Sequence, residues 1–337
     1  MKALWIKDGK AGHQNKVSGL FSALSDTVEL DFTEYDLVWR FPFVRPVLRY
    51  LGRIGLSLPV RWFVKGLPDS GGVDLIVSAG GATLWPNVAL ARQTGIANVF
   101  LGSPRSVPLD AFVVVASHDP PSNELPCYKL EVIPSNVTFE SARRAAEEAG
   151  FEPAQDWGIL IGGDGEGVIW QEEDFLALAN ILIAQAKQAG VHIRVATSRR
   201  TPLAVEAKLR FLFEDSGICV GALWFHDRSS ADHSLLSMMG GCERLFVTAD
   251  SMSMTHEAVS SGRPVFSLLS GRGQVGKRLL GNLDTLEQSG YLVVQTLPGI
   301  EPATVPSGGW VSLRRNPTSK LTGLILEVVG LGHQGEE

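Results

Sequence analysis

Strand-like and helix-like segments alternate along almost the whole chain, and this alternation limits the possible folds more than any other feature. The strand-like runs of the first half cover residues 3–6, 28–32, 75–78, 99–102 and 112–116. Those of the second half cover residues 158–161, 191–196, 219–223, 245–247 and 265–268. Parallel strands need crossover connections, usually helices, so the repetition predicts parallel sheets covered by helices. We therefore predict an α/β fold of two Rossmann-like, doubly wound domains facing across a cleft.

The predicted boundary between the domains lies near residue 152. A short helix at residues 140–149 ends at Gly150, and the following segment contains Pro153, as expected for a connector. The N-terminal Rossmann-like domain is accordingly assigned residues 1–152, and the C-terminal one residues 153–315. Residues 316–337 are left over as a C-terminal helix and tail, and we expect them to pack back on the N-terminal domain.

Composition excludes several classes of protein. The net charge of -6 argues against a nucleic-acid partner. The N-terminus lacks an apolar run with a cleavage site, which predicts a cytoplasmic protein. The three cysteines are widely spaced, and His226–Asp227 with Asp232–His233 is more typical of a polar loop than of a metal cluster. We predict no metal site.

The segment 244–268 has the pattern of a strand, a helix and a second strand. On the expected helix, Ser253 and Glu257 share one face, and Met254 and Ala258 share another that should turn to the core. A carboxylate at this place can accept two hydroxyl hydrogen bonds from a ribose, and the helix start at Ser251 can receive phosphate oxygens. The alternative is a capped surface helix with an ordinary exposed glutamate.

A glycine-containing loop, Asp8–Asn15, follows the first strand and opens the first helix. His13 lies in the first turn of that helix, where it could act as a general base on an acceptor hydroxyl or could simply cap and pack. The loop lacks the Gly-x-Gly-x-x-Gly pattern, so a dinucleotide oxidoreductase is disfavoured.

Three later loops could contact a diphosphate. Gly162 and Gly163 begin a loop whose successive N–H groups suit an anion, although Asp164 and Glu166 in the same loop would repel one. Arg199 and Arg200 follow another strand and offer bidentate donors, or they are solvated surface charges. The segment Gly271–Lys277 resembles part of a P-loop without its Ser or Thr, so we reject an NTPase and retain Gln274 as a sugar or phosphate contact.

Residues 38–65 differ from the rest of the chain. They contain six basic residues, no acidic residue and many apolar ones, in a protein of negative net charge. Arg45, Arg49 and Arg53 recur at helical spacing among aliphatic residues, as expected for a segment on an anionic membrane surface. The alternative is a helical excursion packed on its own domain with its arginines reaching solvent.

Several of these motifs together resemble a known family. They are Asp8–His13, Ser103–Arg105, Phe112–Val115, His118–Pro120, Ile161–Gly163, Thr197–Pro202 and Thr248–Met254 with Glu257–Ala258. In this order, over nearly the whole chain, they resemble the bacterial relatives of the plant "elongated mitochondria" fission protein. The resemblance implies a GT-B-like fold, and plant members of the family are implicated in recruiting a dynamin-related fission machine.

The second half also resembles, more distantly, GT-B glycosyltransferases such as the enzyme that adds N-acetylglucosamine to lipid-linked muramyl peptide. That resemblance implies that Gly12 and His13 face an acceptor. It also implies that Ser251, Ser253 and Glu257 hold the donor nucleotide, with Gln274 near the donor sugar. The chain departs from those enzymes at Lys10, where a glycine is usual, and in the acidic residues of the loop at 162–167.

We therefore expect a membrane-associated glycosyltransferase that uses a nucleotide-sugar donor and a lipid-linked or envelope acceptor, with a role in cell-envelope glycan synthesis. His13 is the expected base, with Asp8 behind it. Arg199, Arg200 and the chain at Gly163 and Ser251 would stabilise the leaving diphosphate. No cofactor is expected, and the predicted location is the cytoplasm, peripheral on the inner face of the membrane. The alternatives are a nucleotide-sugar epimerase of the same fold and a non-catalytic adaptor of the mitochondrial-fission type.

Overall fold

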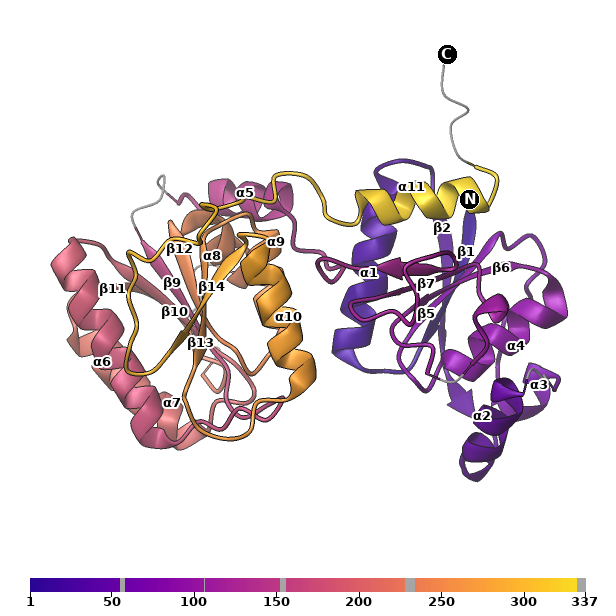
Figure 1. The fold of residues 1–337 in the computed structure, drawn as a ribbon, viewed down its shortest axis with the longest axis horizontal. Helices are drawn as coiled ribbons and strands as arrows, with labels where there is room; N and C mark the ends of the chain where they lie inside the picture. The colour runs from indigo at the N-terminus through magenta and orange to yellow at the C-terminus, as the bar shows by residue number, and fades with distance from the viewer. Residues whose placement is uncertain (55–57, 106, 152–155, 228–233, 332–337) are drawn as a thin grey trace, which may run out of the picture. The chain divides into compact units, whose positions relative to one another are not determined.

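The computed structural model describes residues 1–54, 58–105, 107–151, 156–227 and 234–331. The chain divides into two compact units: Met1–Asn136 together with Pro317–Glu337, and Val137–Asn316. Each unit is built around one six-stranded sheet (Figure 1). The predicted fold class, two Rossmann-like α/β domains, is confirmed.

The sheet of the first unit has the order β2-β1-β5-β6-β7-β8, and all its neighbouring strands are parallel. Its strands are β1 (Lys2–Lys7), β2 (Asp31–Asp36), β5 (Leu75–Ala79), β6 (Ala97–Leu101), β7 (Val114–Ser117) and β8 (Cys127–Lys129). The short strands β3 (Val38–Trp39) and β4 (Val64–Lys65) form a separate antiparallel pair. The helices are α1 (Ala11–Ser25), η1 (Pro42–Val44), α2 (Arg45–Arg53), α3 (Val60–Phe63), α4 (Leu84–Thr94), η2 (Leu109–Ala111) and α11 (Ser319–Val328).

Helices cover both faces of this sheet, as the alternation of side chains in β1 requires. Trp5 packs on one face in a core that includes Leu20 of α1 and Leu321 of α11. Ile6 packs on the opposite face in a core that includes Leu48 of α2 and Trp85 of α4. Successive residues of a strand point to opposite faces, so a strand buried on both sides is apolar throughout.

The sheet of the second unit has the order β11-β10-β9-β12-β13-β14 and is also parallel throughout. Its strands are β9 (Trp157–Ile161), β10 (Ile193–Thr197), β11 (Cys219–Leu223), β12 (Arg244–Thr248), β13 (Val265–Leu269) and β14 (Leu292–Thr296). Its helices are α5 (Phe139–Glu148), α6 (Glu172–Ala189), α7 (Leu203–Asp215), α8 (Leu235–Gly241), α9 (Met252–Ser260) and α10 (Lys277–Gln288).

Each sheet reverses its strand order at one place, and these places position the candidate sites. The reversal lies between β1 and β5 in the first unit, and between β9 and β12 in the second. Open α/β sheets bind ligands beyond the carboxyl ends of the strands at such a switch point. The loops that can form a site are therefore those that follow β1, β5, β9 and β12.

The sequence-based boundary near residue 152 differs from the observed division by one helix. α5 belongs to the second unit because it packs closely against α8: a Cβ on Gly240 would lie only 1.9 Å from the carbonyl oxygen of Ala142. The C-terminal α11 belongs to the first unit, where Leu321 and Ile325 are fully buried.

The expected strand at residues 28–32 is wrong in position. Val28 and Leu30 pack against the core as part of a connection, and the pairing with β1 begins only at Asp31. The sequence analysis did not predict β8 and β14, which follow the last predicted strand of their respective units. β8 is only three residues long, which is too short for a clear alternation of side chains.

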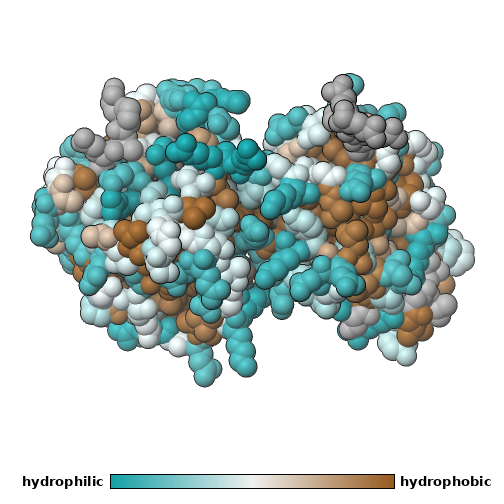
Figure 2. Space-filling view, turned by 45° about the horizontal axis from the view of Figure 1, so that its top comes forward, coloured by the Kyte–Doolittle hydropathy of each residue, from teal (hydrophilic) through white to brown (hydrophobic). Residues whose placement is uncertain are grey.

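Apolar side chains also lie outside the cores. The face of the first unit in Figure 2, on the right, carries a brown area of apolar side chains bordered by hydrophilic ones. Among the described residues, no helix is both long enough and apolar enough to cross a membrane.

Candidate functional site

His13 and Asp8 form a hydrogen-bonded pair beyond the end of β1. The Nδ1 atom of His13 lies 2.8 Å from Oδ2 of Asp8. The Asp8 side chain is almost fully buried, at 3% exposure, whereas the imidazole is 30% exposed. An ionised carboxylate can only accept, so Nδ1 carries the proton and Nε2 is left as the acceptor nitrogen. This arrangement can take a proton from a hydroxyl group placed at Nε2.

The backbone around this pair holds both side chains in place. Lys10 is the N-cap of α1, and its N–H donates to Oδ1 of Asp8 at 3.2 Å. The carbonyl oxygen of Lys10 accepts from the backbone N–H of His13 at 3.0 Å. The Lys10 side chain and Gly12 are exposed beside the pair. The predicted residues of this loop therefore gather at one place.

The loop that follows β5 completes this place with two glycines. A Cβ on Gly80 would lie 2.2 Å from Nδ1 of His13, and one on Gly81 would lie 2.7 Å from a terminal nitrogen of Arg105. Gly80 also has a φ of 90°, which disfavours any other residue. The two glycines therefore let His13 and Arg105 pack directly on the chain at the switch point.

In the second unit, Gly162 and Gly163 follow β9 and are buried. The N–H of Gly162 donates to Oγ1 of Thr248 at 2.7 Å, and its carbonyl oxygen accepts from Oγ1 of Thr201 at 2.7 Å. A Cβ on Gly163 would lie 2.2 Å from the carbonyl oxygen of Arg200. These contacts bring the loops after β9, β10 and β12 together.

Arg200 and Asp250 form an ion pair within this junction. A terminal nitrogen of Arg200 lies 2.7 Å from Oδ2 of Asp250, whose side chain has no exposed surface. Burial raises the pKa of the Asp250 carboxyl above its ordinary value, although Thr248, the Arg200 guanidinium and the Gly163 N–H act in the opposite direction. Arg199, by contrast, is exposed. The two arginines predicted as phosphate contacts therefore have different surroundings, with Arg200 already holding a carboxylate.

Helix α9 begins with the predicted cap. Oγ of Ser251 accepts from the N–H of Met254 at 3.3 Å. Ser253 and Glu257 are both half-buried, and Ala258 is fully buried. The expectation that Met254 turns into the core is not met, because Met254 is itself only half-buried.

The buried face of α9 also carries Thr255 and His256, which the sequence analysis did not identify. Nε2 of His256 lies 3.0 Å from Oδ1 of Asn282, so this histidine is a satisfied core residue.

Gln274 is exposed on the loop that follows β13. Its carbonyl oxygen lies close to Gly167, where a Cβ would approach it to 2.1 Å, so the loops after β9 and β13 touch. Asp164 is used within its own loop, where its Oδ1 accepts from the N–H of Trp170 at 2.8 Å. The nearby Arg272, on the same loop as Gln274, pairs with Asp174 at 2.7 Å.

A buried carboxylate at Glu206 supports the loop that carries the arginines. Its oxygens accept from the N–H groups of Phe225 and His226 at 3.0 and 2.9 Å. The imidazole of His226 in turn contacts the carbonyl oxygen of Thr201 at 3.0 Å. Asp232 and His233 lie outside the described residues. Within the described part of the chain, no three His, Cys, Asp or Glu side chains are grouped as metal ligands would be.

Comparisons with solved structures define the class of fold. The UDP-GlcNAc 2-epimerase from Methanocaldococcus jannaschii is 13% identical over 98% of this chain and 100% of that chain, with a TM-score of 0.56. The same enzyme in complex with UDP-GlcNAc and UDP is 12% identical over 98% and 100%, with a TM-score of 0.49. The E. coli heptosyltransferase WaaC with ADP-2-deoxy-2-fluoro heptose is 11% identical over 89% and 94%, with a TM-score of 0.47. At these identities the likeness concerns the fold alone, and the first of these structures, whose TM-score is 0.56, supports a GT-B-like fold.

The family follows from the sequence. The family described as Mitochondrial fission ELM1 matches residues 11–305, and the chain therefore belongs to it. This confirms the resemblance drawn from the motifs. No curated protein matches the chain.

Proposed function

We propose that this protein is a glycosyltransferase that takes its sugar from a nucleotide-sugar donor and works against the inner face of the cytoplasmic membrane. The observation that carries the proposal is the pairing of a partly exposed His13 with a buried Asp8 at a switch point. Neither an epimerase acting on a free sugar nucleotide nor an adaptor needs a base for an acceptor hydroxyl. The transfer uses no cofactor besides the nucleotide sugar.

In the proposed reaction, the acceptor oxygen attacks the anomeric carbon of the donor sugar, and the nucleoside diphosphate, or CMP in the case of a CMP-sugar, leaves. Nε2 of His13 takes the acceptor proton, and Asp8 stabilises the resulting imidazolium through Nδ1–H. Arg199, the exposed member of the arginine pair, supplies charge to the leaving diphosphate. The ion pair of the half-buried Arg200 with the buried Asp250 holds the glycine loop in place.

We assign the nucleotide to the second unit, beyond the ends of β9 and β12. Support comes from the meeting of two segments: the N–H of Gly162 donates to Thr248, and α9, which begins just beyond Thr248, carries the half-buried Glu257. Gln274 and Ser253 are the proposed contacts to the sugar and the ribose.

The donor site is tested by calorimetric titration with UDP-, GDP-, CMP- and ADP-sugars. We expect one of these classes to bind and Glu257→Ala to weaken it by about tenfold, the loss of a hydrogen bond to a charged group. Glu173→Ala, which removes an exposed glutamate on α6, serves as the matched control. Absence of binding by every class would refute the donor site.

Catalysis is tested separately by measuring turnover of the nucleotide-sugar class that binds. His13→Ala should leave donor binding intact and lower turnover by on the order of 10²–10⁴. Conversion of the free sugar nucleotide to an epimer without any acceptor would identify the epimerase alternative instead. If the nucleotide sugar binds but is not turned over, and His13→Ala does not change its binding, the result would favour the adaptor.

The membrane contact is assigned to α2, which has apolar side chains on two faces. Leu48 points into the core. Val47 and Tyr50 of α2, Phe43 of the preceding η1 and Ile54 directly after α2 are all exposed and follow one another at helical spacing. An exposed apolar stripe of this kind, flanked by arginines, is typical of a helix lying on an anionic membrane.

The predicted arginines of this surface differ in their surroundings. Arg45 is half-buried, with its guanidinium 5.4 Å from the ring of Trp39, so this residue partly fits the alternative of packing on its own domain. Arg53 is exposed. The side chain of Arg49 lies outside the described part of the structure.

Flotation with vesicles that contain anionic lipid tests this contact. Phe43→Ser with Tyr50→Ser should abolish flotation, because the two changes remove the aromatic side chains of the exposed stripe without touching the core. Phe211→Ser is the matched control, since Phe211 is exposed to 69% on α7 and Phe43 to 78%. Equal flotation of all three proteins, or flotation insensitive to salt, would refute the contact.

A further inference from the structure

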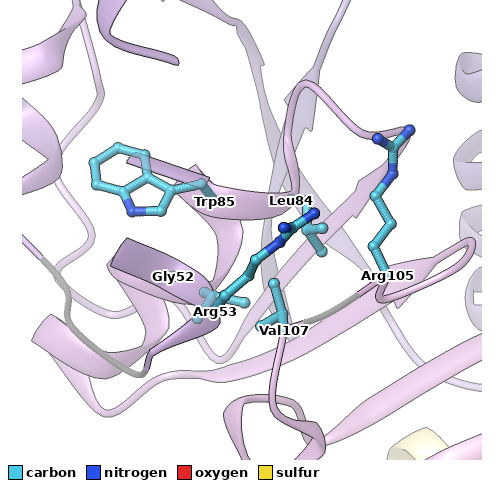
Figure 3. A pocket seen from close by; sticks show the side chains of 7 residues that line it. Gly52, Arg53, Leu84, Trp85, Arg105 and Val107 are labelled. Atoms are coloured by element: carbon cyan, nitrogen blue, oxygen red, sulfur yellow. The ribbon is translucent and has the colours of Figure 1, made fainter. Parts of the chain in front are cut away.

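A pocket in the first unit lies between the end of α2, the start of α4 and the segment before η2. Two arginines and an apolar wall line it (Figure 3): Arg53, Arg105, Leu84, Trp85, Val88 and Val107. In this view the two arginine side chains extend in the same direction, and Leu84 appears between them. The sequence analysis did not predict this combination of charge and apolar surface.

The charge of the pocket is not neutralised by the residues around it. Its lining contains no acidic side chain, and within the described residues no ion pair joins Arg53 or Arg105 to a carboxylate. Other arginines of the same unit do have such partners: Arg61 lies 3.7 Å from Asp69, and Arg92 lies 4.0 Å from Asp110. Two guanidinium groups without a carboxylate at one pocket favour an anion with several oxygens.

Arg105 is held at this place by a strained backbone. Its φ of 57° is one of two positive values among the described non-glycine residues, and such a conformation costs roughly 1–2 kcal/mol for a residue with a Cβ. The guanidinium packs on Gly81, which neighbours Gly80 beneath His13. An anion held by Arg105 would therefore lie on the His13 side of the pocket.

The wall of the pocket is apolar, and its residues are largely buried. Leu84, Trp85 and Val88 belong to the first turns of α4 and are each exposed by less than a twentieth. The part of this wall that remains accessible is apolar, and only an anion that carries a hydrocarbon chain would gain from contact with it. The pocket is also bounded by α2, the helix with the exposed apolar stripe.

We propose that this pocket binds the phosphate of a single-chain amphiphile, with the phosphate oxygens on Arg53 and Arg105 and the first part of the hydrocarbon chain on Leu84, Trp85 and Val88. One pair of cations and one apolar wall match one phosphate and one chain. A role of this ligand as the acceptor of the sugar rests on the proposed function, and the acceptor class would then be a lipid phosphate. Its binding does not depend on that function.

The test is calorimetric titration of the full-length protein with dodecyl phosphate below its micelle concentration, without vesicles. Inorganic phosphate supplies the head alone, and dodecyl maltoside supplies the chain with an uncharged head. We expect dodecyl phosphate to bind at least about tenfold more tightly than either, since it alone meets both parts of the pocket.

Arg53→Gln and Arg105→Gln should each weaken dodecyl phosphate by about tenfold, the loss of a charged hydrogen bond. Arg144→Gln, which removes an exposed arginine on α5, is the matched control and should change nothing. Equal affinity for inorganic phosphate, equal affinity for dodecyl maltoside, or no effect of either arginine would overturn the proposal. Nucleotide-sugar binding is assigned to the second unit and dodecyl phosphate binding to the first. A negative result in one titration therefore leaves the other proposal intact.

Discussion

His13 lies against a glycine whose missing side chain leaves room for the imidazole. Gly80 has a positive φ and lies at the switch point of the first sheet, so two separate requirements fall on one residue. Gly72 offers a comparison within the same unit. It also has a positive φ, of 73°, but no atom lies within 4 Å of the position that a Cβ would take there.

We predict that Gly80→Ala displaces the imidazole and that Gly72→Ala does not. Both changes carry the backbone strain of roughly 1 kcal/mol, measured as the free energy of unfolding in denaturant. Only Gly80→Ala should also shift the NMR resonances of the His13 ring. Identical ring resonances in both variants would contradict the packing of His13 on Gly80.

Cys242 provides a prediction about pH. Burial raises the pKa of its thiol to about 12 from an ordinary 9.0. The folded state therefore retains a proton that the unfolded state loses, and stability should fall as the pH rises from 9 towards 12, by at most about 1.4 kcal/mol per pH unit. Below pH 9 this contribution is fully present.

Urea unfolding of the second unit between about pH 8 and about pH 10.5 measures this slope. Cys242→Ala should flatten it, whereas Cys127→Ala, which removes a buried thiol of the first unit, should not. In the native protein an alkylating reagent should reach Cys219, which is only half-buried, far faster than Cys242. A slope that survives Cys242→Ala would assign the pH dependence to other groups.

Residues close in sequence were the ones that could be predicted together. Asp8 and His13 are five residues apart, and Ser251 caps the helix that begins directly after this serine, so local spacing was enough. The ion pair between Arg200 and Asp250 joins residues fifty positions apart through the order of the strands, which no local pattern reveals. Arg53 and Arg105 are also far apart in the sequence, and only the fold brings them to one pocket.

At the scale of elements, alternation located most strands and helices, because both faces of each sheet are buried and the central strands are apolar throughout. It could not locate β8, with three residues, nor show that α5 packs on α8 rather than on the unit that precedes it in the chain. That association depends on a small residue, Gly240, at the contact.

We predict that Gly240→Ala separates α8 from α5 and destabilises the second unit by about 2 kcal/mol or more, as overpacking against backbone does. Gly281→Ala is the matched change: this glycine lies in α10 with open space around it, and an alanine should stabilise the helix by up to about 1 kcal/mol. Thermal unfolding of both variants measures the difference. A neutral Gly240→Ala would mean that the two helices can move apart freely.

At the scale of the whole molecule, the two units differ in how the chain builds them. The second unit is one continuous segment, Val137–Asn316, whereas the first combines Met1–Asn136 with the C-terminal segment from Pro317. Leu321 and Ile325 of α11 are fully buried in the core that also contains Trp5 and Leu20. The first unit therefore needs both ends of the chain.

We predict that residues 137–316 fold when expressed alone and that residues 1–136 do not. Without α11 the first unit exposes the core residues that pack on Leu321 and Ile325, and losing even one such buried side chain costs about 2–5 kcal/mol. A peptide of residues 317–331 added in excess should restore cooperative unfolding to residues 1–136, because it refills the same core. In that peptide, Ile325→Asp should abolish the rescue, and Lys320→Asp, at an exposed position of the same helix, should not. Cooperative unfolding of residues 1–136 without the peptide would show that α11 only covers a core that is already complete.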